Sequence, residues 1–229
     1  MRPRGARPSP RHKLLSATPH RIVGATPPQW LWLPSTLSFW GNQTYGDCVS
    51  AEEAFAKACH SPEIFIPENM VINWARTNGF LNGSYLPDVM AAMQAGGFQP
   101  WGVTYDDGPY TGVDWTNEAV LQNAISIGPV KIGVASDQLE NVVPDPPSNG
   151  WLATGFQNDQ NLDHCVSLCG YGPMGWLASQ LGGSIPDSAA PGYAMFTWSS
   201  VGIIDQASVL AITGEAWLRT PTTVAKWQG

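Results

Sequence analysis

The sequence predicts an α+β domain in two packed halves, a helical half followed by a half built from strands. Apolar residues recur at helical spacing in four segments between residues 48 and 128. From residue 130 the pattern changes to alternating, β-branched segments that are typical of strands. Helices that precede strands in this way indicate an α+β fold, and we find no internal repeat or strong linker after residue 38.

Composition excludes two broad classes of protein. With 43% hydrophobic residues, 11 Trp, 6 Tyr and 7 Phe, the 229-residue chain has ample core material and is not disordered as a whole. The longest apolar runs, such as residues 89–93, are far shorter than the roughly 20 residues that a bilayer demands. No membrane partner is therefore expected.

Each expected helix has its own start and stop signals. The first is Ala-rich and has Asp47 at the position of an N-cap. The second and third helices each begin at a proline. An Asn-Gly pair ends the second helix, and a Gly-Gly pair ends the third. A Gly-Pro pair ends the fourth. The expected ranges are 48–60, 66–79, 86–97 and 117–128.

The second half is expected to contain strands at 130–135, 165–170 and 193–199, where β-branched and aromatic residues alternate with others. Residues 137–160 are rich in Pro, Asn and Gly, which predicts a long loop. The segment between the last two strands carries a Gly-Gly pair and resembles a hairpin connection.

Charge divides the chain into a basic arm and an acidic body. Residues 1–22 hold six of the 11 basic residues and none of the 18 acidic residues, giving +6, while the remaining five basic and 18 acidic residues give −13. We therefore expect a basic, Pro-rich N-terminal arm with an extended anchor, residues 1–37, and a folded domain, residues 38–229.

The partner of this arm stays open at the level of sequence. An acidic protein surface in an assembly, nucleic acid and the chain's own acidic body all complement its charge. Because the body has a net charge of −13, it is poorly suited to bind the phosphate backbone of a duplex. Any contact with nucleic acid is therefore expected from the arm alone.

The expected location is cytoplasmic or virion-associated, because no apolar stretch of a classical secretory signal follows the basic start. The four cysteines and four histidines complete no recognisable zinc spacing, so neither a metal nor another cofactor is expected. The same context favours reduced thiols, although Cys59, Cys165 and Cys169 leave the redox question open.

A candidate nucleophile stands at the start of the first helix. In Gly41-Asn-Gln-Thr-Tyr-Gly-Asp-Cys48 the thiol falls on the first helical turn, where unpaired backbone N–H groups favour a thiolate. The same N–H groups and the side-chain amide of Gln43 are suited to hold an oxyanion. The base is His164, in Asp163-His-Cys-Val-Ser-Leu-Cys-Gly-Tyr-Gly172, more than a hundred residues downstream.

These motifs resemble the papain-like cysteine peptidases. Gln43 and the Gly-Asp-Cys sequence look like the oxyanion-hole glutamine and central helix of that family, and the strand at His164 looks like its histidine strand. The chain is similar in particular to uncharacterised phage and bacterial proteins with the motifs GN-x-x-YGDCV and HCV-x-x-x-GY. The resemblance implies a papain-like fold whose catalytic residues are Cys48, His164 and Gln43, with no cofactor.

Three departures from the family pattern bear on the site. Gln43 stands five positions before Cys48, where the family usually has six, and the 37 residues ahead of the core are fewer than its usual inhibitory segment. The asparagine that orients the histidine is missing, because Phe196 or Trp198 falls at its position. As its replacement we consider Ser199, Asp205, Asp163 and water.

Two functions from different classes therefore remain. The first is a papain-like cysteine hydrolase, a peptidase or amidase with an incomplete triad, acting on a peptide or amide substrate. The second is a catalytically silent scaffold that serves as a structural or binding component, for instance of a phage particle, with residues 1–37 docked on a protein partner. Transglutaminase-like acyl transfer would use the same residues as the hydrolase.

Overall fold

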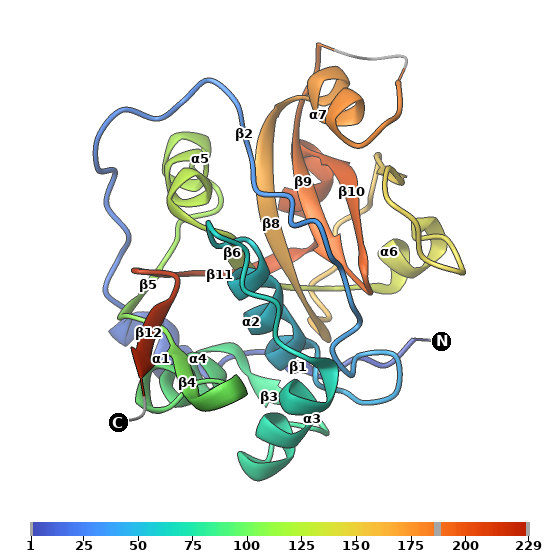
Figure 1. Cartoon of the computed structure of the whole chain (residues 1–229). Helices are drawn as coiled ribbons and strands as arrows, with labels where there is room; N and C mark the ends of the chain where they lie inside the picture. The colour runs from blue at the N-terminus through green and yellow to red at the C-terminus, as the bar shows by residue number, and fades with distance from the viewer. Residues whose placement is uncertain (1, 186–188, 228–229) are drawn as a thin grey trace.

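The chain folds into a helical half and a sheet half, as Figure 1 shows for the computed structural model, which describes residues 2–185 and 189–227. The helical half holds α2 (Cys48–Ala58), α3 (Glu68–Thr77) and α4 (Leu86–Ala95), with the short β3 (Ser84–Tyr85) before α4. The expected α+β class is confirmed, and α2 to α5 (Glu118–Ile127) match the four expected helices in order.

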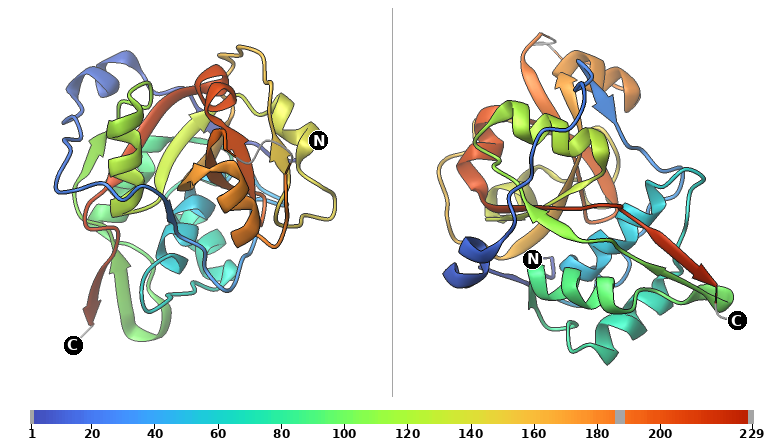
Figure 2. Two further views of the ribbon diagram at one scale, coloured as in Figure 1. Left: turned by 90° about the horizontal axis from the view of Figure 1, so that it is seen from above. Right: turned by 90° about the vertical axis from the view of Figure 1, so that its left-hand side faces the viewer.

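The main sheet has eight strands among the described residues, in the order β5-β11-β6-β8-β9-β10-β7, with β2 paired to β8. All pairs along this path are antiparallel except β10 with β7. A separate pair, β4 with β12, lies outside the main sheet (Figure 2). The strands are β2 (Trp30–Leu31), β4 (Val103–Asp106), β5 (Tyr110–Gly112), β6 (Val130–Val134), β7 (Leu152–Ala153), β8 (His164–Pro173), β9 (Pro191–Thr197), β10 (Ser200–Asp205), β11 (Thr213–Arg219) and β12 (Val224–Trp227).

Several elements lie where no helix was predicted. α6 (Asp137–Val142) lies in the expected long loop, α7 (Met174–Gln180) replaces the expected hairpin connection, and α8 (Gln206–Ile212) follows β10. Each has only six or seven residues. Helices of this length are set by packing against neighbours and leave little periodic signal in a sequence.

The two faces of the sheet bury different chemistry. On β6, Val130, Ile132 and Val134 join the apolar core shared with α5, while Lys131 points to the opposite face, toward α2. This alternation follows from the two-residue period of a strand. All eleven residues of α2 are buried, so the polar residues on this helix must find partners inside the protein.

A buried charge cluster connects α2 to the sheet. Arg219 on β11 donates to Glu53 through Nε (2.8 Å), to the Pro129 carbonyl through Nη1 (3.0 Å), and to Glu52. Lys131 bonds to Glu53 and lies 3.0 Å from Glu52. The cluster consists of three acidic and three basic side chains that are almost fully buried: Glu52, Glu53, Lys57, Asp107, Lys131 and Arg219.

The cations decide the ionisation of the cluster's central carboxylate. Burial alone would raise the pKa of Glu53, but Arg219 and Lys131 hold it well below its usual range. The carboxylate is therefore charged at neutral pH, and its charge depends on both partners staying in place.

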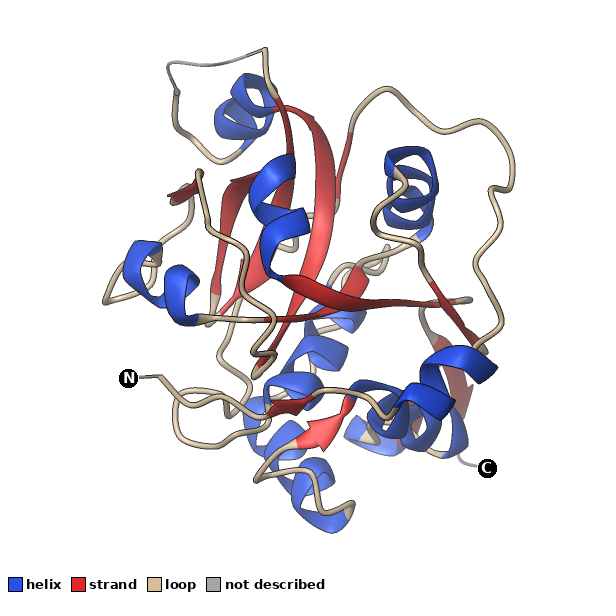
Figure 3. Ribbon diagram, turned by 180° about the vertical axis from the view of Figure 1, so that it is seen from behind, coloured by secondary structure: helices blue, strands red, loops and turns tan. Residues whose placement is uncertain are grey.

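The N-terminal arm lies on the chain's own body. Its β1 (Ala6–Arg7) pairs in parallel with β3, its α1 (Arg11–Ser16) packs beside α4, and β2 joins the main sheet. Figure 3 shows this segment crossing between the sheet and the helices below it. No helix of the described part of the chain is long and apolar enough to cross a membrane, and all four cysteines are free and buried.

Arg219→Met should lower the free energy of unfolding by about 3–5 kcal/mol, because it leaves Glu52 and Glu53 buried beside too few cations. Urea unfolding followed by tryptophan fluorescence measures this change. The matched control is Lys13→Met, which removes the half-exposed ion pair with Asp88 and should cost about 1 kcal/mol or less. Equal costs for the two variants would contradict the role assigned to the cluster.

Candidate active site

Cys48 is the first residue of α2, and its thiol is buried in the protein. Burial raises the pKa of the thiol to about 12, although hydrogen bonds from the backbone of Cys165, Gly5 and Ala6 act in the opposite direction. Two of these backbone groups belong to the arm. The thiol is therefore neutral here, despite its place at a helix start that favours a thiolate.

His164 opens β8 and is held on two sides. Its Nε2 lies 2.8 Å from the hydroxyl oxygen of Thr197, and its ring stacks on Trp198 with centroids 4.3 Å apart. Nδ1 is buried and has no partner among the described residues. If Nε2 carries the hydrogen and donates it to Thr197, Nδ1 keeps a free lone pair, as a base requires.

The described side chain that hydrogen-bonds to the His164 ring is therefore Thr197, and not one of the sequence-based candidates Ser199, Asp205 and Asp163, to which water was the alternative. Ser199 lies in the turn between β9 and β10 with a φ of 62°, away from the His164 hydrogen bond. Asp205 caps α8 by accepting from the Ser208 amide, at the other end of β10. The Asp163 carboxylate accepts from Ser136 and pairs with Arg4.

Phe196 explains why the usual orienting position is lost. Its ring stacks on Phe55 of α2 with centroids 4.0 Å apart and also contacts Trp40. This residue belongs to the apolar core, so the strand presents a hydroxyl to the imidazole one residue later. A threonine in that position carries no pattern in the sequence that marks it as functional.

Gln43, the predicted oxyanion donor, lies apart from Cys48 and His164 in this structure. Gln43 is exposed, and its amide donates to Glu68 on α3 at 3.0 Å, so it does not reach the site in this state. The neighbouring Asn42 is buried, and its Nδ2 contacts the Pro3 carbonyl of the arm at 3.4 Å. Asn42 stands six positions before Cys48, which is the spacing that the family resemblance implies and that Gln43 does not meet.

The arm crosses the site as an extended peptide held by its backbone. The Ser84 amide donates to the Gly5 carbonyl (2.8 Å), and the Ala6 amide donates to the Asp163 carbonyl (3.1 Å). The Pro3 carbonyl contacts Trp198 Nε1 at 3.4 Å as well as Asn42. Both walls of the site thus bind main-chain groups, a mode that accepts peptides of many sequences.

Glycine makes this close approach sterically feasible. A Cβ atom added to Gly5 would lie 1.7 Å from the Gly46 carbonyl oxygen, and one added to Gly46 would lie 2.6 Å from the Arg4 carbonyl oxygen. The backbones at Gly5 and Gly46 could not move apart without breaking the hydrogen bonds that hold the arm on either side of this contact.

The two catalytic candidates are both neutral in this state. Burial, followed by the charges of Arg4 and Arg2, shifts the pKa of His164 to about 3, opposite in direction to the shift at Cys48. The described residues include no hydrogen bond between the Cys48 thiol and the His164 ring. The backbone of the arm bonds to the Cys48 thiol, and the charges of Arg4 and Arg2 oppose a charged His164, so the imidazole is held neutral in this state.

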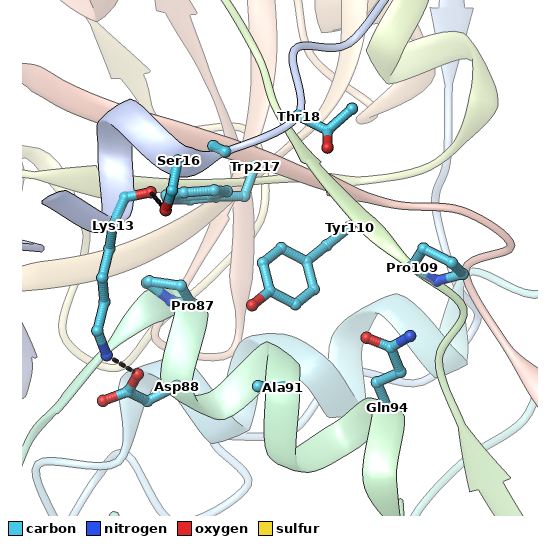
Figure 4. A pocket seen from close by; sticks show the side chains of 11 residues that line it. Lys13, Ser16, Thr18, Pro87, Asp88, Ala91, Gln94, Pro109, Tyr110 and Trp217 are labelled. Carbon is cyan, nitrogen blue, oxygen red and sulfur yellow. Dashed lines mark hydrogen bonds and ion pairs between the residues drawn. The ribbon is translucent and has the colours of Figure 1, made fainter.

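A separate cavity of about 410 Å³ lies beside the arm, between α1 and α4 (Figure 4). Lys13 and Ser16 line it on the arm, Asp88 and Gln94 on α4, and Trp217 on β11. Neither Cys48 nor His164 lines it, so this cavity is separate from the candidate active site.

A central helix that begins at a cysteine, against a sheet whose histidine strand faces it, defines the papain-like class of folds. This chain has that fold. It is similar to procathepsin L 3 of Tenebrio molitor larval midgut, with a TM-score of 0.63 and 15% identity, covering 89% of this chain and 73% of that chain. It is also similar to the bromelain protease from Ananas comosus (0.59, 13%, covering 84% and 98%) and to xylellain, a cysteine protease from Xylella fastidiosa (0.58, 13%, covering 90% and 91%).

These likenesses establish the fold alone, because the sequence identities are low. No family model and no curated protein sequence matches the chain. The activity therefore has to be argued from the site.

Asp47 precedes Cys48, and its carboxyl group is buried in surroundings that disfavour its charged form. It is the N-cap residue of α2, as expected, but its side chain makes no capping bond, and no other described residue hydrogen-bonds to either of its buried oxygens. Burial raises its pKa to about 8. Gly41, with a φ of 103°, leaves room for it, since a Cβ there would lie 2.4 Å from Oδ2.

Because the folded state binds this proton more tightly, Asp47 should contribute stability below its ordinary pKa of 3.8 that is lost as pH rises toward 8. Asp47→Asn should therefore become progressively more stable than the natural chain between pH 4 and pH 8. Urea unfolding at four pH values across that window measures the difference. A difference that does not change with pH would contradict the burial of a protonated carboxyl group.

Proposed function

We propose that the chain is a papain-like cysteine hydrolase of peptide or amide bonds, in a state closed by its own N-terminal arm. The observation that carries the proposal is a peptide backbone bound along the Cys48 thiol, with hydrogen bonds to Ser84 on one side and to Asp163 on the other. A surface that holds an extended peptide against a helix-start thiol is suited to attack on its carbonyl groups.

In the proposed reaction the Cys48 sulfur forms a bond to the substrate carbonyl carbon, and the His164 Nδ1 receives the thiol proton. The Asn42 amide and the N–H groups at the start of α2 stabilise the oxyanion. The C–N bond then breaks, and the amine leaves with the proton held by His164. Water attacks the thioester, again through His164, and releases the acid and the free thiol.

The closed state follows from the same contacts. The arm fills the position of a substrate, and its Pro3 carbonyl occupies the Asn42 amide. Because β1 runs parallel to β3, the arm's direction is fixed by these backbone contacts. A hydrolase of this kind becomes active when residues 2–8 leave the site.

Gly5→Ala should open the site, because the added methyl group collides with Gly46. We expect iodoacetamide to label Cys48 in this variant at least about tenfold faster than in the natural chain, since the thiol gains both access and ionisation. Mass spectrometry after tryptic digestion locates the adduct. Gly96→Ala, where a Cβ meets nothing within 4 Å, is the matched control and should leave the rate unchanged.

The proposed base is tested on the open variant. Adding His164→Ala to Gly5→Ala should remove the acceleration and leave a rate typical of a model thiol. A Cys48 that reacts no faster than a model thiol, with His164 present and the arm displaced, would overturn the hydrolase and favour the catalytically silent scaffold. Peptide turnover in water without added amine separates hydrolysis from acyl transfer.

Thr197 is proposed as a positioning residue for His164. On the Gly5→Ala background, Thr197→Val should slow labelling of Cys48 by about 10- to 100-fold, part of what a positioned base contributes. Thr197→Ser keeps the hydroxyl and should restore most of the rate. The pH profile distinguishes positioning from folding, because the valine variant alone should lose the inflection that belongs to His164.

A further inference from the structure

The part of the site that contacts residues 2–4 of the arm is strongly acidic. Asp137 and Glu140 on α6 and Asp163 before β8, which we call the acidic cluster, all bind the guanidinium of Arg4. Its Nη1 lies 2.6 Å from Asp163 Oδ2. Burial would lower the pKa of Arg4, but hydrogen bonds to these three carboxylates raise it above its ordinary value.

The acidic cluster is built by the body and does not depend on the arm for its shape. Asp163 Oδ1 accepts from both the amide (3.1 Å) and the hydroxyl (2.8 Å) of Ser136, which fixes the carboxylate. α6 carries the other two carboxylates on one short helix. When the arm leaves, three negative charges remain together without the guanidinium that now separates them, which costs free energy until another cation binds.

A second contact beside the cluster is also suited to arginine. The Arg2 guanidinium lies 5.1 Å from the centre of the Trp198 ring, whose other neighbour is the stacked His164 ring. Arg2 also donates its backbone N–H to Glu140 at 2.6 Å. A planar guanidinium can stack on the indole and bind several carboxylates at once, which a lysine ammonium does less well.

These contacts lie next to the reacting atoms. Arg4 precedes Gly5, whose backbone bonds to the Cys48 thiol, and the charges of Arg4, Glu140 and Arg2 all act on His164. His164 Nδ1 is buried and unpartnered in the same region, so a ligand held by the cluster is presented to the base.

We propose that the acidic cluster and Trp198 select substrates with an arginine side chain within one or two residues of the bond that Cys48 attacks. This inference rests on the proposed hydrolase function, and it assigns the substrate class to peptides rich in arginine. The arm, with Arg2 and Arg4, then holds the site closed because it carries the side chains that the site recognises.

The test uses the full-length Gly5→Ala protein and fluorescein-labelled peptides that copy residues 2–8. Fluorescence anisotropy compares the natural peptide with peptides that carry citrulline or lysine in place of Arg4. We expect the arginine peptide to bind about tenfold or more tightly than the citrulline peptide, with lysine between them. Binding of all three with equal affinity would overturn the proposal.

The cluster itself is tested by charge removal. Asp137→Asn with Glu140→Gln on the same background should reduce the arginine preference to about twofold or less, because one carboxylate remains. Asp145→Asn, an exposed acid in the loop after α6, is the control and should keep the full preference. A preference that survives the double variant would also overturn the proposal.

Two further readouts separate the inference from the hydrolase. In the otherwise natural chain, Arg4→Lys should speed hydrogen exchange at residues 2–8 by about tenfold, and an unchanged rate would count against guanidinium recognition. Internally quenched versions of the peptides then test cleavage. Binding preference without cleavage or Cys48 labelling would overturn the hydrolase alone, whereas cleavage without arginine preference would overturn the inference alone.

Discussion

The docking of α2 on the sheet is the constraint from which the geometry of the site follows. Glu52, Glu53 and Lys57 point from this helix into the protein, where Lys131 and Arg219 pair with the two glutamates and Asp107 pairs with Lys57. An axial shift of the helix would leave buried charges unpaired at a cost of several kcal/mol. The same alignment places Cys48, one turn before Glu52, against the backbone of Cys165.

Sequence patterns predicted the residues whose function depends on local context. Cys48 was expected at a helix start and His164 on a strand with a distinctive motif, and the structure places both residues there. The apolar periods of α2 to α5 and of β6, β8 and β9 were equally local. The buried charge cluster was not predicted, because charged residues are ordinarily exposed and nothing local marks Lys131 or Arg219 as buried.

The two missed site residues depend on backbone geometry that sequence spacing does not encode. Trp40 and Gly41 both have positive φ, 48° and 103°, and this turn leads the chain so that Asn42 is buried while Gln43 faces solvent. Thr197 contacts His164 because Phe196 is occupied in the core against Phe55. In each case a neighbouring residue carried the expected chemistry, and packing decided which of the two reached the site.

The contacts between the arm and the body explain why the sequence divides into a basic and an acidic part. Arg4 and Lys13 of the arm pair with carboxylates of the body. Residues 3–6 lie along the site. Electrostatic attraction alone would hold a basic segment on many parts of an acidic body. The glycine contacts at Gly5 and Gly46 are what restrict it to one path, since only a backbone without side chains fits there.

Departure of the arm would change the pKa values of Cys48 and His164, the two ionisable groups of the proposed site. Burial is the main cause that raises the pKa of Cys48 to about 12 and lowers that of His164 to about 3. In the proposed open state water replaces the arm and burial weakens at both groups, which favours a more acidic thiol and a more basic imidazole, although the thiol also loses the backbone hydrogen bonds of Gly5 and Ala6 that lower its pKa. The two Arg side chains that also oppose a charged His164 leave in the same step. In the proposed hydrolase, access to the site and formation of a thiolate–imidazolium pair would therefore be coupled through the same segment.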